Sequence, residues 1–203
     1  MNILFEDESI VVCQKERGVL SENGAKGAPG MVELLQQCCE SEIYPVHRLD
    51  KPVGGVMVYA KTQKAAAHLS KQVADRSFDK QYIALVHSHP EEKQGRMEDL
   101  LFFDRGKNKS FVVKKERRGV KKAVLEYECI STCDEKSLVK VKLLTGRTHQ
   151  IRVQFASRKM PLFGDRRYGA SDDSKLLALW SHSVSFTHPV TGERMSFELD
   201  WDF

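Results

Sequence analysis

The sequence lacks any apolar run long enough to cross a bilayer, which takes about 20 residues in a helix. Residues 1–7 hold no basic region followed by an apolar core, so we expect no secretory signal. The cysteines are odd in number and form no Cys-x-x-Cys pair (Cys13, Cys38, Cys39, Cys129 and Cys133). This pattern predicts reduced thiols in a cytoplasmic protein, because disulfide frameworks and zinc sites need paired cysteines.

Internal repeats, heptads, low-complexity tracts and a nucleotide-phosphate loop are also missing from the sequence. What is present is a chain of 203 residues, 41% hydrophobic and 30% charged, with a net charge of +4. This composition is typical of a globular protein and argues against disorder. The length suits one domain, or one domain with a small lobe.

Hydrophobic periodicity predicts an α+β protein. Apolar residues recur at helical intervals in residues 31–39 and 63–76, which predicts two helices. Alternating or short apolar runs predict strands within residues 3–15, 56–60, 80–86, 95–103, 110–116, 121–130, 137–144, 176–186 and 195–199. The strands at 110–116 and 121–130 are expected to form a hairpin around Arg117-Arg118-Gly119. Because strands outnumber helices, we expect a largely antiparallel sheet.

The stretch from Val46 to Lys61 places charged residues beside a tight turn. His47-Arg48-Leu49-Asp50 is followed by Pro52 and Gly54-Gly55, and residues 56–60 then form an apolar run. Proline fixes φ and glycine permits positive φ, so this pattern predicts a turn that leads into a buried strand. Asp50 would then lie on a loop held by a rigid element, where catalytic groups often lie. The alternative is a surface turn whose aspartate caps backbone amides.

Residues 114–122 hold six cations and one anion. Such a cluster neutralises phosphates and gives salt-dependent affinity for nucleic acid. The alternative is a solvated hairpin tip that charge keeps soluble.

Residues 145–156 combine a helix start with two arginines. Gly146 ends the preceding strand, and Thr148 is expected to cap a helix from residue 149 to about residue 158. Arg147 and Arg152 lie near the start of this helix, where backbone amides favour an anion. That anion could be a phosphate or a protein carboxylate.

Together, these segments resemble the RluA-like family of RNA pseudouridine synthases. The resemblance covers residues 3 to about 197, and the segments that carry it are His47-Arg48-Leu49-Asp50 with Gly55 and Ala60-Lys61, Lys80-Gln81-Tyr82-Ile83-Ala84, Leu144 to Val153, Pro161 to Asp165 with Tyr168-Gly169, and His182 with Thr187-His188-Pro189. It implies the pseudouridine synthase fold, a long mixed and mainly antiparallel sheet flanked by a few helices, with a central cleft. It also implies a single catalytic domain over residues 1–203, without the N-terminal RNA-binding module of some relatives.

The resemblance implies that the protein isomerises uridine to pseudouridine in ribosomal or transfer RNA. This reaction breaks the glycosidic carbon–nitrogen bond, turns the base and rejoins it through carbon, so we expect no metal and no organic cofactor. The family pattern makes Asp50 the nucleophile and Arg152 its counter-charge. An arginine partner would keep the carboxylate charged and fix its direction.

Further residues are implied to contact RNA. The target base must be extruded from its stack, at a cost of a few kcal/mol. Arg48 would fill the gap, because its planar guanidinium can stack and bind phosphate, and Tyr82 would stack on the uracil. His47 either takes part in the site or orders the loop through a backbone hydrogen bond. Arg147 and His149 are expected to support the site or bind phosphate, and the basic residues of 114–122 to contact the RNA backbone (Lys114, Lys115, Arg117, Arg118, Lys121 and Lys122). We expect RNA as the partner, no membrane partner, and a monomer.

The chain departs from the family pattern at three places. It has Val53-Gly54 where the family usually has Thr-Ser, Glu16 where a proline usually follows Lys15, and Gln154 where the third motif usually continues into a second histidine. These departures concern the substrate site more than the reaction. They leave open a catalytically silent RNA-binding or assembly protein on the same fold. A glycoside hydrolase is disfavoured, because that chemistry usually needs a pair of carboxylates.

Overall fold

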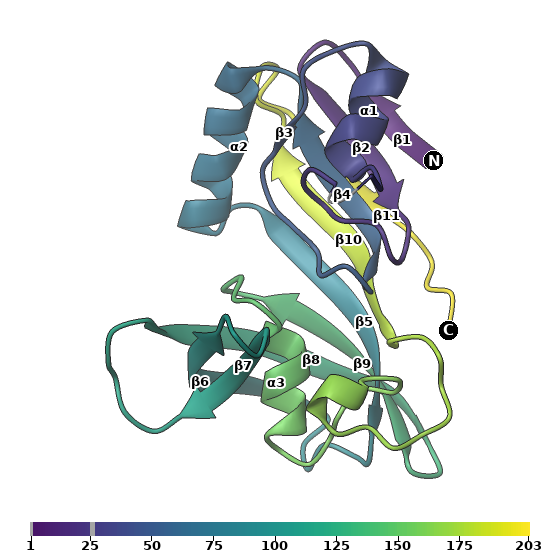
Figure 1. Ribbon diagram of the computed structural model, residues 1–203, viewed down its shortest axis with the longest axis vertical. Coiled ribbons are helices and arrows are strands. Elements are labelled where there is room, and N and C mark those ends of the chain that lie inside the picture. The colour runs from purple at the N-terminus through teal and green to yellow at the C-terminus, as the bar shows by residue number, and fades with distance from the viewer. Residues whose placement is uncertain (1, 25–26) are drawn as a thin grey trace. The chain divides into compact units, whose positions relative to one another are not determined.

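The computed structural model describes residues 2–24 and 27–203 and confirms the predicted α+β class (Figure 1). The chain divides into two compact units, which we describe separately. Unit 1 comprises the residues up to 80 together with 180–202, and unit 2 comprises residues 81–179 with Phe203. The single-domain organisation stays a prediction.

Unit 1 is a mixed sheet with two helices. Its strands are β1 (Asn2–Glu6), β2 (Ile10–Lys15), β3 (Tyr44–Pro45), β4 (Gly54–Ala60), β10 (Leu179–Thr187) and β11 (Arg194–Glu198). They follow the order β1-β2-β4-β10, with β3 paired to β4 and β11 paired to β10. β4 and β10 run parallel, and the other pairs are antiparallel.

Every residue of β4 is buried, as the sequence predicted for residues 56–60. Helix α2 (Gln63–Asp75) packs Ala65 and Leu69 against one face of this sheet, and Thr62 caps the helix by accepting from Ala65 N at 3.1 Å. Helix α1 (Met31–Cys39) has the predicted bounds and lacks a side-chain cap at Gly30, but Glu33 accepts from the Gly30 amide at 2.9 Å. The hydrophobic core of unit 1 therefore fixes the strand that follows the Asp50 loop.

Unit 2 is an antiparallel sheet with one short helix. Its strands follow the order β5-β9-β8-β6-β7, with bounds β5 (Asp79–His87), β6 (Gln94–Asp104), β7 (Lys109–Val113), β8 (Val120–Cys133) and β9 (Lys136–Leu143). Helix α3 (Gln150–Ala156) and the 3₁₀ turn η1 (Arg166–Tyr168) lie in the same unit. Val153 and Tyr168 pack with Leu101 and Ala123 of the sheet, so α3 and η1 share one small core.

The strand pairing of unit 2 corrects the predicted hairpin around residues 117–119. β7 and β8 both pair with β6, on opposite edges, so residues 114–119 form a connection past β6. The tight turn lies instead at residues 104–109, between β6 and β7. There Asp104 accepts from Lys107 N at 3.0 Å, and Asn108 takes a left-handed conformation with φ of 46°.

The start of α3 corrects a second prediction. His149, with φ of 53°, stands at the N-cap, and no side chain caps this helix, so Thr148 has no capping role. Thr148 contributes its carbonyl instead, which accepts from Ser110 Oγ at 2.6 Å. Gln150 orders the entry to the helix, because its Oε1 accepts from Arg147 N at 3.0 Å and from Thr145 Oγ1 at 2.8 Å.

Candidate active site

Asp50 lies half-buried on the loop between β3 and β4 in unit 1. Val53 N donates to Asp50 O at 2.9 Å, which closes the predicted turn. Gly55 follows with φ of 120°, and a Cβ at this position would lie 2.2 Å from Ser181 O. The loop therefore joins β4 where that strand meets the backbone of β10, and a larger residue than glycine would push the two apart.

Two neighbouring carbonyls, those of Lys51 and Pro52, anchor the Asp50 loop to the segment after β2. Gly18 N donates to Lys51 O at 2.8 Å, and Lys15 Nζ donates to the same oxygen at 3.2 Å. Arg17 Nη1 donates to Pro52 O at 3.4 Å. Three donors from one segment thus hold the backbone directly after the carboxylate.

Ser21 holds the loop on the other side of Asp50. Its Oγ donates to Leu49 O at 2.8 Å and accepts from Leu49 N at 2.9 Å. Ser21 is buried, and its own carbonyl accepts from the Tyr59 hydroxyl at 2.9 Å. Asp50 is therefore fixed by main-chain bonds to the residues before and after it.

Lys15 places a buried cation beside this carboxylate. The side chain has 0% exposure, and its Nζ donates to Glu16 O at 3.0 Å as well as to Lys51 O. Burial lowers the pKa of Lys15 to about 8, while the negative charge of Asp50 opposes this shift. The two opposite charges attract each other, so Lys15 supplies a buried positive charge to the Asp50 side of unit 1.

Arg17 connects the Asp50 loop to two residues of the C-terminal part of unit 1. Its guanidinium lies 5.2 Å from the centre of the Trp180 ring, and it forms an ion pair with Asp202 near the C-terminus. The Trp180 ring also explains Gly54, because a Cβ at residue 54 would lie 2.4 Å from Trp180 Cζ3. Gly54, part of one departure from the family pattern, and Arg17, which follows another at Glu16, thus lie against one tryptophan.

His47 has the structural role that the sequence left open. Its Nε2 accepts from Val58 N at 3.1 Å, and its ring lies 5.2 Å from the Phe78 ring. Burial, with a smaller effect from the Lys80 charge, lowers the pKa of His47 to about 3. His47 is therefore a neutral imidazole that ties the Asp50 loop to β4.

Arg48 differs from its neighbours because its side chain is 59% exposed. Its Nη1 lies 3.9 Å from Glu22 Oε1, a loose surface ion pair. Within the tetrad, His47 and Leu49 turn inward while Arg48 reaches solvent.

In unit 2, Tyr82 lies buried on β5, opposite Val141 of β9. Strand neighbours point to opposite faces, so Tyr82 and Gln81 belong to different faces of this sheet. Tyr82 shares its face with Ala84 and Val86, which are also buried, as the alternation predicted.

Arg152 is buried on α3 and binds a carboxylate. Its Nε donates to Asp165 Oδ2 and its Nη2 to Asp165 Oδ1, each at 2.7 Å. The Tyr168 ring centre lies 5.1 Å from the guanidinium carbon. Sequence analysis missed both partners, although the motif that holds them, Pro161 to Gly169, was part of the resemblance. Asp50 belongs to unit 1 and Arg152 to unit 2, and the pairing of the two stays a prediction.

His149 joins the same network through the Tyr168 hydroxyl. Its Nδ1 lies 2.9 Å from that oxygen, which also accepts from Ser110 N at 2.8 Å. Burial raises the pKa of Tyr168, so the phenol stays protonated at neutral pH. Tyr168 thus connects the helix start, the β6–β7 hairpin and Arg152.

The predicted basic residues of 114–122 are exposed but do not form one group. The Arg117 guanidinium lies 4.8 Å from the Phe102 ring centre, on the connection after β7. Lys121 and Lys122 belong to β8, and Lys122 forms an ion pair with Glu98. Arg147 Nε donates to Lys122 O at 2.9 Å, so Arg147 supports β8.

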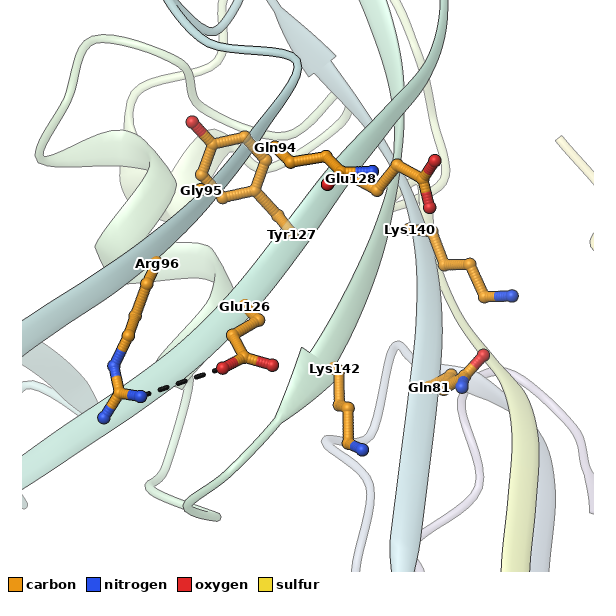
Figure 2. Close-up of a pocket in the computed structure, with 9 residues that line it drawn as sticks. All are labelled: Gln81, Gln94, Gly95, Arg96, Glu126, Tyr127, Glu128, Lys140 and Lys142. Atoms are coloured by element: carbon orange, nitrogen blue, oxygen red, sulfur yellow. Dashed lines mark ion pairs between the residues drawn. The ribbon is translucent and has the colours of Figure 1, made fainter.

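A hollow of about 550 Å³ lies on the polar face of the unit 2 sheet (Figure 2). Most of the residues that line it are charged or amide side chains of β5, β6, β8 and β9, and the full set is Gln81, Gln94, Gly95, Arg96, Glu126, Tyr127, Glu128, Lys140 and Lys142. Figure 2 shows Arg96 paired with Glu126, at 3.7 Å. The hollow contains none of the predicted site residues, and its opposite charges sit on adjacent strands, as in a solvated sheet face.

Within the described residues, no three His, Cys, Asp or Glu side chains gather as a metal site. In the same part of the chain, no helix has the length and apolar character to span a membrane.

Comparison with known proteins gives concordant matches. A family described as RNA pseudouridylate synthase matches residues 9–157. A dual-specificity RNA pseudouridine synthase RluA from Escherichia coli K12 is 34% identical over 213 residues, covering 99% of this chain and 93% of that protein. A ribosomal large subunit pseudouridine synthase D from Zymomonas mobilis is 31% identical over 220 residues, covering 98% and 69%. The solved structure of human RNA pseudouridylate synthase domain containing 4 has a TM-score of 0.80 at 21% identity, covering 99% and 88%.

Proposed function

The chain belongs to the RNA pseudouridylate synthase family and is an RNA pseudouridine synthase, and we propose that it acts on ribosomal or transfer RNA with Asp50 as nucleophile. The anchored loop carries this proposal, because hydrogen bonds to the main chain on both sides hold Asp50 while the buried Lys15 supplies an opposite charge. The named activities of the bacterial relatives support the choice of RNA. The proposal places the enzyme in the cytoplasm, as a monomer.

The Asp50 carboxylate either attacks the ribose or takes a proton from it to start elimination. Either role depends mainly on the position of this carboxylate, which the anchored loop supplies. Arg152 is proposed as a second counter-charge from unit 2, where Asp165 fixes its guanidinium. No cofactor takes part in this scheme.

The remaining residues handle the RNA. Arg48, exposed beside the carboxylate, replaces the extruded base in the stack. Tyr82 stacks on the flipped uracil. Arg147, His149 and the basic residues of 114–122 bind or support the RNA backbone, which gives affinity with little sequence information.

Deletion of the gene in its host, followed by pseudouridine mapping across total RNA, tests this function. At least one pseudouridine should disappear and return with the wild-type gene. The Asp50→Ala variant should bind RNA but restore nothing, whereas the matched control Asp173→Ala, an exposed loop aspartate, should restore the site. An unchanged map would contradict the proposed function, and restoration by Asp50→Ala would remove Asp50 from its role.

A further inference from the structure

A second group of cations lies outside residues 114–122, on the β6–β7 turn and on η1. We call it the turn patch, and its members are Arg105, Lys107, Lys109, Arg166 and Arg167. Four of the five are exposed and Lys109 is half-buried. The turn and η1 are about 60 residues apart in sequence, and the fold brings Arg167 to the turn, while the adjacent Arg166 donates to Asp172 O at 3.2 Å.

The turn patch is held in place by its own side chains. Arg167 Nη1 donates to Asn108 O, and lies 3.5 Å from Lys107 O, so η1 is fastened to the turn. Asp104 is the single acid in residues 104–109, and its Oδ1 accepts from Lys107 N. The acid therefore shapes the turn, and the positive charges in these segments outnumber it.

Tyr168 links the turn patch to the proposed active site. Lys109 Nζ lies 4.9 Å from the centre of this ring, and the Arg152 guanidinium carbon lies 5.1 Å from the same centre. Lys109 Nζ also lies 5.8 Å from the Phe111 ring centre, as does Lys107 Nζ. Cations over aromatic rings keep their charge while their stems are ordered. The turn patch thus begins one ring away from Arg152, the residue proposed as a counter-charge to the nucleophile.

Like charges held close together repel each other, so a fixed patch of this kind favours a polyanion. The proposed function supplies one, because each nucleotide beside the target uridine carries a phosphate. We infer that the turn patch binds the phosphates of the nucleotides next to the target uridine, and that it supplies affinity rather than catalysis. This inference rests on the proposed function for the identity of its ligand.

Neutralisation of two exposed members tests the inference. The variant is Lys107→Gln with Arg166→Gln, which leaves Arg167, Lys109 and the Tyr168 network in place. The matched control is Lys64→Gln with Lys71→Gln, two exposed cations of α2. The probe is a fluorescein-labelled 20-nucleotide RNA hairpin with a uridine-rich loop, and the readout is its Kd between 50 and 300 mM KCl.

Loss of two phosphate contacts should reduce the slope of log Kd against log salt by about 1.4 to 1.8. At 0.1 M salt the patch variant should bind at least tenfold more weakly than the control, and its kcat at saturating RNA should stay within twofold of the wild type. Equal Kd and slope for the two variants would overturn the inference, as would a fall in kcat with an unchanged Kd. The Kd is measured without turnover, so the two proposals are tested separately. A wild type that makes no pseudouridine would contradict the proposed function, and the comparison of Kd values would still decide whether the turn patch binds RNA.

Discussion

Arg152 and Asp165 form a buried, bidentate ion pair, with both hydrogen bonds at 2.7 Å. Two charged groups taken out of water are tolerated because each satisfies the other. The pair also fixes the direction of a long and otherwise flexible arginine side chain, on which the proposed mechanism depends.

Removal of one partner from this pair should destabilise unit 2. We expect Asp165→Ala to lower the unfolding free energy by about 3 to 5 kcal/mol, because it removes the carboxylate that accepts two hydrogen bonds from a buried guanidinium. Urea denaturation measures this, with Asp173→Ala as the control. The double variant Arg152→Ala with Asp165→Ala should lose less than the sum of the single losses. Additive losses would show that the two side chains do not stabilise each other.

Lys15 should make stability depend on pH in the alkaline range. Its pKa is about 8 in the folded protein and near 10.5 in the unfolded chain, so between these values the unfolded state binds more protons. The unfolding free energy should therefore gain about 2 kcal/mol from Lys15 between pH 8 and pH 10. Denaturation of the wild type and of Lys15→Met across this range isolates the contribution of Lys15 to the unfolding free energy, since the other groups titrate equally in the two proteins. Parallel pH profiles would contradict the assigned burial.

His47 should make the stability of the fold depend on pH in the acidic range. Its pKa is about 3 when folded and near 6.5 when unfolded, so the unfolded state again binds more protons between these values. Stability should fall by about 1 to 2 kcal/mol on this account as the pH drops from 7 to 5. His47→Gln keeps an acceptor for Val58 N without the titration, so it should show the smaller fall. An imidazole pKa near 6.5 by NMR would refute the prediction directly.

Gly54 and Trp180 should depend on each other. Gly54→Ser restores the usual family residue but places its Cβ 2.4 Å from Trp180 Cζ3 and 3.2 Å from Lys15 O. We expect a loss of about 1 to 3 kcal/mol from overpacking. Combination with Trp180→Leu should recover part of that loss, which a double-mutant cycle of thermal unfolding would measure. Gly54→Ser with unchanged stability would show that the ring moves aside without cost.

The helices and strands with strong periodicity could be read from the sequence. α1, α2, β4 and β9 follow the predicted ranges closely, because their apolar spacing matches the faces that they bury. The hairpin at 117–119 was wrong because its basic residues resembled a loop tip, whereas strand order is decided by pairing between distant segments. β6 is long enough to pair on both edges, and no local pattern shows that.

The motif residues of the candidate site could be predicted from the sequence, but the residues that hold them in place through hydrogen bonds could not. His47, Arg48, Asp50, Tyr82, His149 and Arg152 come from short patterns in the chain. Lys15, Ser21 and Asp165 act through contacts that span from 13 to 36 residues, so local spacing does not reveal them. A lysine at the end of an apolar strand was the one available hint, since full burial of lysine needs a partner.

The loop around Asp50 is held through its main-chain carbonyls and amides, groups that do not depend on the side chain, except that proline lacks the amide hydrogen. Replacing the exposed side chain at residue 51 would leave each of those bonds available. The side chain at residue 51 can therefore change while the main chain keeps the Asp50 carboxylate in place. Under the proposed function, residue 51 is therefore a position to vary in a search for an enzyme with a different target RNA.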